Sequence, residues 1–165
     1  MSNASDSKAN ESAVVIRLMS DADVDRICAL EKEIFPDPWP RSAFVEQLDL
    51  DGWGTIVAEL NGVVVGYACY MMVANESHLT NIAVDPIWRR KSVAKTLLEH
   101  ILQIVVANAC DILLLEVRPS NTEARAFYER YGFKELYRRR NYYRRPVEDA
   151  LVMVRHLEGS SATTD

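Results

Sequence analysis

Residues 82–94 read IAVDPIWRRKSVA and place the end of an apolar strand, a short basic loop and the start of a long helix in direct succession. Asp85-Pro86 ends the strand that we predict over residues 77–84, because proline lacks the N–H that a sheet ladder needs. Residues 93–109 then repeat apolar side chains at helical spacing, which predicts a helix with a wide apolar face. A strand followed at once by such a helix is typical of an α/β protein.

The strongest signal upstream of this segment is a hairpin. Asn61-Gly62 joins two apolar runs and suits the positive φ angles of a type I′ turn, so residues 55–60 and 63–73 are its predicted strands. Before the hairpin we predict a strand at 14–18 and helices at 21–35 and 42–48, the helices being separated by three prolines that neither can continue through.

Downstream of the long helix we predict three strands and one more helix. Residues 112–115 are continuously apolar, which favours a strand covered on both faces. Ser120 and Glu123 form a capping-box pattern that opens a helix, and Gly132 is placed to end it. The apolar side of that helix carries Ala124, Phe127, Tyr128 and Tyr131, and closing strands are predicted at 133–138 and 150–157. Seven strands and four helices in this order predict a mixed α/β sandwich.

The composition indicates one globular domain. The chain has 165 residues, 48% of them hydrophobic and 26% charged, a balance typical of soluble folded proteins. We assign residues 13–157 to the domain and expect the polar segments 1–12 and 158–165 to be flexible. No apolar run is long enough to span a bilayer, and the polar start lacks the apolar core of a secretory signal. We therefore expect a cytoplasmic protein without membrane contacts.

Charge and cysteine usage argue against several classes of protein. The net charge of −5 is unfavourable for nucleic-acid binding, although arginines gather at 138–140 and 144–145. We interpret that cluster as a solvated strand face, with an acidic peptide or ribosomal RNA as alternative partners. Cys28, Cys69 and Cys110 are far apart and form no CxxC pair, so we predict neither a metal site nor a disulfide and assign them to the core.

The basic loop carries the first chemical signal. N–H groups of a loop and of a first helical turn have no internal partner, and the helix dipole adds partial positive charge there. With Arg89, Arg90 and Lys91 beside them, these groups suit a pyrophosphate. A basic turn with solvated side chains explains the same residues equally well.

Glu116 and Tyr128 carry the second signal. Glu116 continues an otherwise apolar strand, so we expect desolvation to raise its pKa and make it a candidate base. Tyr128 lies about two helical turns beyond Asn121. On residue type alone the structural alternatives are favoured: Glu116 as the partner of an arginine such as Arg118, and Tyr128 as a core aromatic.

Taken together, these motifs resemble the GCN5-related N-acetyltransferase (GNAT) superfamily. The family's R-x-x-G-x-G/A pyrophosphate loop aligns with Arg89-x-x-Ser92-x-Ala94. Further motifs are similar to those of the RimI-type subgroup, whose members acetylate the N-terminal amine of ribosomal protein S18: HLTNIAVD at 78–85, LEVR at 115–118, SN at 120–121, FYERYGF at 127–133, RRNYY at 139–143 and FPDPW at 35–39. The resemblance covers residues 14–157 and implies a mixed, mostly antiparallel sheet flanked by helices.

The resemblance also implies direct acetyl transfer from acetyl-CoA, without a metal. Glu116, acting through a water, would deprotonate the acceptor amine as general base, and Tyr128 would protonate the leaving thiolate as general acid. The backbone of Ile82, Ala83 and Val84 would bind the pantetheine and the acetyl group. The pyrophosphate would be held by Arg89, Arg90, Lys91, Ser92, Val93, Ala94 and Lys95, and Asn121 would help to secure CoA.

Ser92 departs from the family pattern, which has glycine at this position. Glycine tolerates unusual φ angles and lets the backbone approach the phosphates closely. A serine is strained or crowds the phosphates there, although its hydroxyl could donate a compensating hydrogen bond. We hypothesise that this chain binds acetyl-CoA more weakly than a glycine version would.

The acceptor leaves alternatives open. Trp39, Tyr142 and Tyr143 could wall a groove for an extended peptide N-terminus, with ribosomal protein S18 as the expected partner, or could be ordinary packing residues. A small amine such as a polyamine or an antibiotic is the nearest alternative, and a negatively charged pocket beside Glu116 would favour a polyamine. A non-catalytic acetyl-CoA-binding module is a third possibility, against which the presence of both Glu116 and Tyr128 argues.

Overall fold

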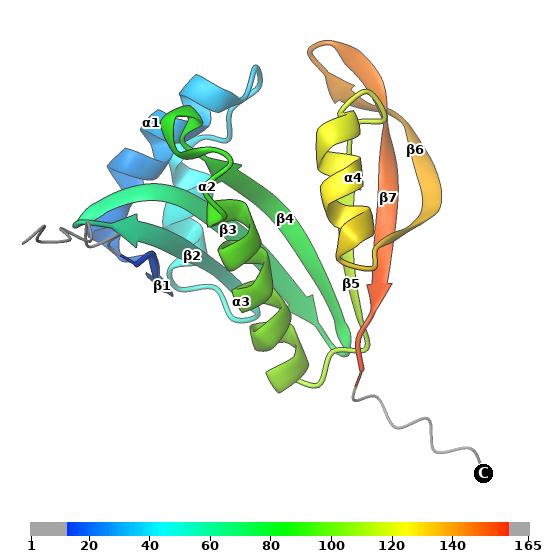
Figure 1. The fold of residues 1–165 in the computed structure, drawn as a ribbon, viewed down its shortest axis with the longest axis horizontal. Helices are drawn as coiled ribbons and strands as arrows, with labels where there is room; N and C mark the ends of the chain where they lie inside the picture. The colour runs from blue at the N-terminus through cyan, green and yellow to red at the C-terminus, as the bar shows by residue number, and fades with distance from the viewer. Residues whose placement is uncertain (1–12, 159–165) are drawn as a thin grey trace, which may run out of the picture.

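The computed structural model describes residues 13–158, so the predicted flexible segment 1–12 and residues 159–165 of the predicted tail lie outside the described residues. Seven strands form one sheet in the order β1-β2-β3-β4-β5-β7-β6 (Figure 1). The strands are β1 (Val15–Leu18), β2 (Trp53–Leu60), β3 (Val63–Val73), β4 (Glu76–Val84), β5 (Ile112–Val117), β6 (Lys134–Arg144) and β7 (Val147–His156). Within this sheet β4 and β5 pair in parallel and the other neighbours are antiparallel, which confirms the expected fold class.

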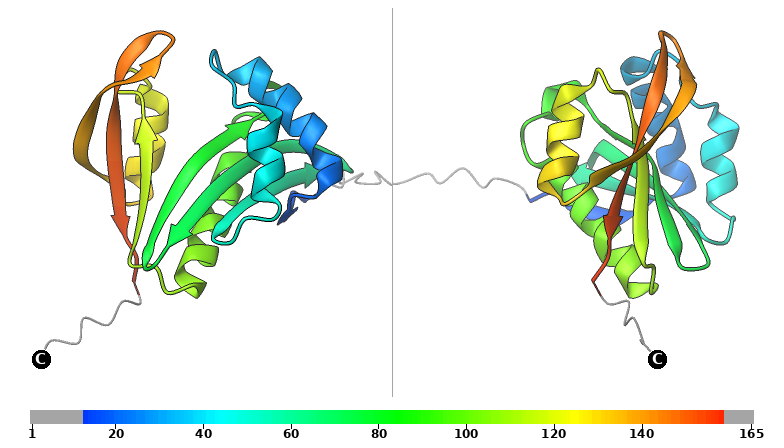
Figure 2. Two further views of the ribbon diagram at one scale, coloured as in Figure 1. Left: turned by 180° about the vertical axis from the view of Figure 1, so that it is seen from behind. Right: turned by 90° about the vertical axis from the view of Figure 1, so that its right-hand side faces the viewer.

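Helices cover both faces of the sheet. They are α1 (Val24–Ile34), α2 (Arg41–Gln47), α3 (Val93–Ala107) and α4 (Thr122–Arg130), with short 3₁₀ turns η1 (Asp21–Asp23) and η2 (Pro86–Trp88). α3 and α4 share one apolar core, and α1 and α2 pack in another against the opposite face (Figure 2). Cys69 and Cys110 are buried in these cores as predicted, while Cys28 is half-buried beside the second. None of the helices in residues 13–158 is long and apolar enough to cross a membrane.

Two glycines in and beside β3 decide local geometry. Leu60 pairs with Val63 across a two-residue loop in which Asn61 and Gly62 have φ of 51° and 78°, so the predicted type I′ hairpin is confirmed. At Gly66 a Cβ atom would lie 2.9 Å from the carbonyl oxygen of Ala83 and 3.2 Å from Val93. The bare backbone at this position lets the start of α3 pack closely on β3 and β4.

The two parallel strands part from each other halfway along β4. β4 and β5 pair from Glu76 and Ile112 as far as Leu79 and Leu115, and a β-bulge at residue 80 then interrupts the pairing of β4 with β3. Beyond this point, in the sheet described here, β4 continues beside β3 alone and β5 beside β7 alone. Figures 1 and 2 show the two halves of the sheet opening like a V. The backbone of residues 80–84 therefore turns an unpaired edge toward the opening.

Several sequence predictions need correction. The N-cap of α4 is Asn121, whose Oδ1 accepts from the N–H of Ala124 at 3.1 Å, and not Ser120, whose hydroxyl donates to Glu148. β5 alternates buried and half-buried residues, so it is not covered on both faces. β6 continues to Arg144, past the predicted end at residue 138, and β7 begins at Val147, before the predicted start at residue 150, because the arginine-rich stretch belongs to a mostly exposed edge strand.

Candidate active site

Glu116 lies on β5 just past the point where β4 and β5 part. Its Oε2 lies 2.5 Å from Nε2 of His78 on β4, and its Oε1 accepts a hydrogen bond of 3.2 Å from Arg139 on β6. Only a tenth of the Glu116 side chain is exposed. The arginine that we named as a structural alternative, Arg118, instead pairs with Glu148 at 3.3 Å.

The pKa of Glu116 corrects our expectation. Burial does favour the neutral acid, but the hydrogen bonds and charges of His78 and Arg139 outweigh it and hold the pKa of Glu116 below its ordinary value. The carboxylate is therefore ionised at neutral pH. Glu116 forms a group with His78 and Arg139, and our expectation of an isolated carboxyl whose pKa is raised by desolvation was wrong.

Sequence reasoning missed His78 and Arg139 as members of this group. His78 lies opposite Leu114 in the parallel register, two residues from Glu116, so the two side chains share a face of the sheet. The alternation of side chains along β4 could have shown which residues share a face with His78. Only the register of β4 with β5 shows that His78 lies beside Glu116.

Tyr128 lies in the apolar core formed with α3 and α4, on the other face of the sheet from Glu116. It is buried on α4 and packs edge-on against Phe127 and Phe133, with ring centroids 5.3 and 5.6 Å away. Burial first, and then the neighbouring phenol of Tyr143, raise the pKa of Tyr128 well above its ordinary value, so it keeps its proton at neutral pH. Burial first, and then Tyr142 and the charge of Glu116, raise the pKa of Tyr143 well above its ordinary value.

The two predicted catalytic residues reach the sheet from opposite faces. Leu113, Leu115 and Val117 pack in the core that contains Tyr128. Side chains alternate along a strand, so Glu116 points to the other face, on the side of α1 and α2. A reactant threaded between the parted strands would meet a carboxylate on one side and a phenol on the other.

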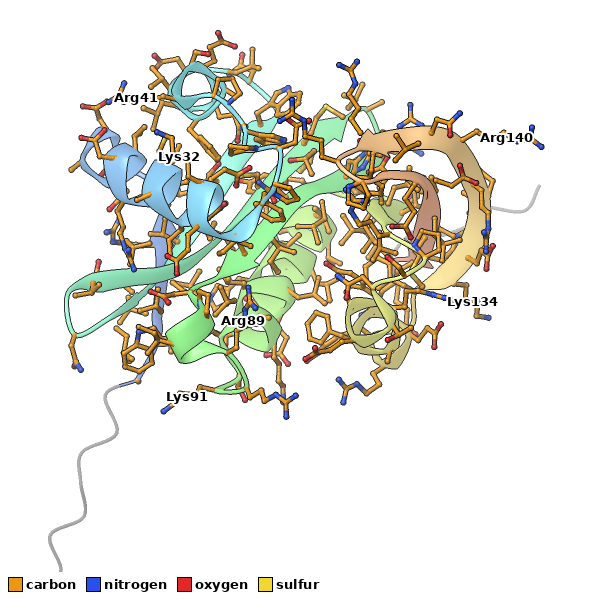
Figure 3. All side chains as sticks on the ribbon, turned by 90° about the horizontal axis from the view of Figure 1, so that it is seen from above. Lys32, Arg41, Arg89, Lys91, Lys134 and Arg140 are labelled. Atoms are coloured by element: carbon orange, nitrogen blue, oxygen red, sulfur yellow. The ribbon has the colours of Figure 1, made fainter. Side chains whose placement is uncertain are left out.

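The basic loop lies at the start of α3 and is anchored by Asp85. This carboxylate accepts from the N–H of Ile87 at 3.0 Å and from Arg26 of α1 at 2.8 Å. Figure 3 shows Arg89 and Lys91 at this end of the helix, and both are exposed. Lys91 also lies over the ring of Trp88 at 5.5 Å.

The backbone of this loop suits an anion. Arg90 and Ser92 have φ of 61° and 62°, and Ser92 is the N-cap of α3. Alternation of left-handed residues turns successive N–H groups toward a common point, and the first turn of a helix adds unpaired N–H groups. The left-handed Ser92 also confirms that this position has the φ angle for which glycine is suited.

The remaining predicted cofactor residues lie around the same opening. Ile82 is half-buried and Ala83 and Val84 are buried at the end of β4, and Val93, Ala94 and Lys95 form the first turn of α3. The side-chain oxygen of Asn121 is used in capping α4.

The predicted acceptor residues divide between two segments. Trp39 is half-buried, with its ring centroid 5.7 Å from that of Phe44. Tyr142 and Tyr143 pack edge-on at 5.0 Å on β6, where Arg139 lies over Tyr142 and Arg118 over Tyr143. The α1–α2 connection and the β6–β7 hairpin stand on opposite sides of the open end of the V (Figure 1).

A cavity of about 480 Å³ lies at the paired end of β4 and β5, away from Glu116. It is lined by Asn75, Glu76, Asp111, Ile112, His156 and Leu157, none of which we predicted as a site residue. Within residues 13–158 no group of three His, Cys, Asp or Glu side chains is arranged to hold a metal ion.

Comparisons with known proteins give a consistent result. The model of the "Acetyltransferase (GNAT) family" matches residues 24–133. A putative [ribosomal protein bS18]-alanine N-acetyltransferase of Bacillus subtilis is 32% identical over 139 residues, covering 84% of this chain and 92% of the relative. The [ribosomal protein bS18]-alanine N-acetyltransferase of Escherichia coli K12 is 35% identical over 128 residues, covering 75% and 84%.

Solved structures show the same similarity. The crystal structure of the ribosomal-protein-S18-alanine N-acetyltransferase from Escherichia coli superposes with a TM-score of 0.85 at 30% identity, covering 93% of this chain and 99% of that one. Ard1 from Thermoplasma volcanium superposes with a TM-score of 0.80 at 25% identity, covering 88% and 98%.

Proposed function

The chain belongs to the GNAT family of acetyltransferases and is an N-acetyltransferase of the RimI type, and from this premise we propose that it acetylates the N-terminal alanine of ribosomal protein S18 in the cytoplasm. The observation that carries the proposed chemistry is the contact of Glu116 with His78 and Arg139 at the point where β4 and β5 part. The proposed acceptor is supported by the names of the relatives in Bacillus subtilis and Escherichia coli.

Acetyl-CoA supplies the activated thioester. In our proposal the unpaired backbone edge of residues 82–84 binds its pantetheine and acetyl group between the parted strands. The left-handed loop and the start of α3 bind its pyrophosphate, assisted by the positive charges of Arg89, Arg90 and Lys91.

The acceptor must lose a proton before it can attack. An N-terminal ammonium has a pKa near 8, so most of it is protonated at neutral pH. Glu116 is ionised but its lowered pKa makes it a weak base alone. We assign proton removal to the Glu116 carboxylate, acting through one water, with His78 and Arg139 orienting it by their hydrogen bonds.

The leaving group must gain a proton. The amine nitrogen forms a bond to the acetyl carbon as the carbon–sulfur bond breaks, and the departing thiolate takes the proton of the Tyr128 hydroxyl. Burial of Tyr128 keeps that proton in place until a strong base forms beside it. Because Glu116 and Tyr128 lie on opposite faces of the sheet, the acceptor and CoA would each enter from its own side.

The charge around Glu116 separates the peptide from the small-amine alternative. Arg139 lies against the carboxylate and places positive charge where a polyamine would have to bind. A negatively charged pocket, which would favour a polyamine, therefore does not describe the surroundings of Glu116. A peptide N-terminus carries a single charge and can extend away from this position.

Acetylation of synthetic peptides tests the proposal directly. The protein is incubated with acetyl-CoA and peptides that differ in their first residue, including an S18-like peptide beginning with alanine, and mass spectrometry locates the added acetyl group. We expect modification of the α-amine of the alanine peptide, and none of the same peptide with a blocked N-terminus. Acetylation of a polyamine in preference to every peptide would reject the proposed acceptor.

A further inference from the structure

Glu31 of α1 is a buried carboxylate that the catalytic proposal does not use. It is 1% exposed, and within residues 13–158 no Lys, Arg or His side chain forms an ion pair with it. Its oxygens instead accept from three neutral donors: the Tyr67 hydroxyl, Nδ2 of Asn81 at 2.9 Å and the backbone N–H of Trp39 at 3.0 Å. Burial of a carboxylate is costly unless such donors satisfy it.

The two oxygens of Glu31 hold different parts of the molecule. Oε1 accepts from Trp39, in the proline-containing connection between α1 and α2. Oε2 accepts from Tyr67 on β3 and from Asn81 on β4. One carboxylate thus ties an irregular loop to two central strands.

Both ends of this link lie at the proposed reaction site. Asn81 directly follows the β-bulge at residue 80 and precedes the backbone edge of residues 82–84 assigned to the acetyl donor. Trp39 belongs to the α1–α2 connection, which stands at the open end of the V facing the β6–β7 hairpin (Figure 1). Glu31 therefore lies between the strand that holds the donor and the segment that faces the acceptor.

We propose that Glu31 is a positioning residue that fixes the α1–α2 connection relative to β4, and so places the acceptor amine relative to the thioester. This inference rests on the proposed function, because it assumes a peptide acceptor at the open end of the V. Its consequence is specific: loss of the link impairs use of the peptide while the donor loop at Arg89–Ser92 and the Glu116–His78 pair stay intact.

Two substitutions break the link to different degrees. In Glu31→Gln the amide oxygen can still accept from Trp39, and the amide NH₂ can donate to the Tyr67 hydroxyl, but the bond from Asn81 is lost because two donors then face each other. Glu31→Met has similar length and no acceptor for any of the three. The matched control is Asp23→Asn, which alters another buried carboxylate in the turn preceding α1, bound to Arg17 and away from Trp39.

The measurements are the KM for the alanine peptide, the Kd for acetyl-CoA and hydrogen exchange of the Trp39 amide. We expect the peptide KM to rise in the order wild type, Glu31→Gln, Glu31→Met, by about tenfold or more in the last, since small misplacement of a reactant has large effects. The Kd for acetyl-CoA should stay unchanged, and the Trp39 amide should exchange faster in Glu31→Met than in Asp23→Asn.

The outcomes separate this inference from the proposed function. If the wild-type protein acetylates no peptide, the proposed function fails and the acceptor role of Glu31 fails with it. If the wild-type protein is active and both Glu31 variants have the peptide KM of Asp23→Asn, Glu31 is purely structural and only this inference is overturned. Should Glu31→Met not fold, the comparison of Glu31→Gln with Asp23→Asn decides.

Discussion

Replacement of Ser92 by glycine tests the acetyl-CoA loop, and its effect can be estimated from the backbone. Ser92 has φ of 62° and ψ of 16°, a left-handed conformation that costs a residue with a Cβ atom about 1–2 kcal/mol. Glycine avoids this cost but loses about 0.5–1 kcal/mol more conformational entropy when it is ordered. The balance favours Ser92→Gly by about 0.5–1 kcal/mol, and 1 kcal/mol corresponds to about a fivefold change in an equilibrium constant.

Ser92 is left-handed without acetyl-CoA, so relief of this strain should appear in the free energy of unfolding, whereas acetyl-CoA binding should change because glycine removes the Cβ atom beside the proposed phosphate site. The Ser92 side chain is exposed at the N-cap of α3, beside the N–H groups that we assign to the pyrophosphate. In our proposal a serine Cβ there limits how closely the phosphates approach, in addition to straining the loop. We expect Ser92→Gly to raise the free energy of unfolding in urea by about 0.5–1 kcal/mol and to bind acetyl-CoA more tightly, as measured by isothermal titration calorimetry.

Ala109 provides the matched control. It has φ of 58° just past the other end of α3, so Ala109→Gly relieves similar strain far from the loop. We expect this variant to raise the free energy of unfolding in urea while leaving the Kd for acetyl-CoA unchanged. Equal or weaker acetyl-CoA binding by Ser92→Gly, with Ala109→Gly stabilised as expected, would show that serine does not weaken this loop.

Three further predictions concern the reacting groups and the stability of the fold. Glu116→Gln and Tyr128→Phe should each lower kcat, by about 10²-fold or more for a lost acid or base, while calorimetry finds acetyl-CoA affinity retained; near-normal turnover in both would remove these assignments. His78 and Arg139 hold the pKa of Glu116 below its ordinary value despite its burial, so the decrease of kcat/KM toward acidic pH should reflect protonation of the acceptor amine. The midpoint of this decrease should shift between peptides whose amines differ in pKa; the same midpoint for all peptides would contradict this. The hydrogen bond from Arg17 lowers the pKa of Asp23 from 3.8 to about 2. This difference corresponds to roughly 2 kcal/mol in the free energy of unfolding, which is present above about pH 4 and is lost as the pH falls toward 2. Asp23→Asn should therefore unfold in urea with about 2 kcal/mol less free energy at pH 7 and show little of the wild-type loss at low pH.

Local signals were sufficient for most of the fold. The Asn61-Gly62 turn and the apolar spacing of α3 depend on neighbours in the chain, and both predictions are confirmed. The capping box failed because Glu148, 28 residues away from Ser120 in the chain, binds the Ser120 hydroxyl and leaves Asn121 to cap α4. β6 was predicted too short because an exposed edge strand has no apolar alternation to reveal it.

The candidate site residues could be predicted from the sequence where they belong to motifs of the family. The resemblance gave the positions of Glu116, Tyr128 and the basic loop, and the left-handed φ of Ser92 agrees with the expectation that glycine suits its place. The predicted direction of the Glu116 pKa shift was wrong because that direction depends on His78 and Arg139, which lie 38 and 23 residues away in the chain. The Glu31 link likewise joins residues that only the register of β3 and β4 brings together.

The place of the site follows from one feature of the topology. A parallel pair within an otherwise antiparallel sheet requires a crossover, and here α3 makes it between β4 and β5. A crossover helix starts where the first strand ends, so the positive end of α3 lies at the carboxyl end of β4. β5 runs in the same direction and brings Glu116 to that same edge, followed by the N-terminus of α4. The groups that we propose for anion binding and for proton removal are thus brought to one edge by chain direction, and the parting of β4 from β5 opens that edge between them.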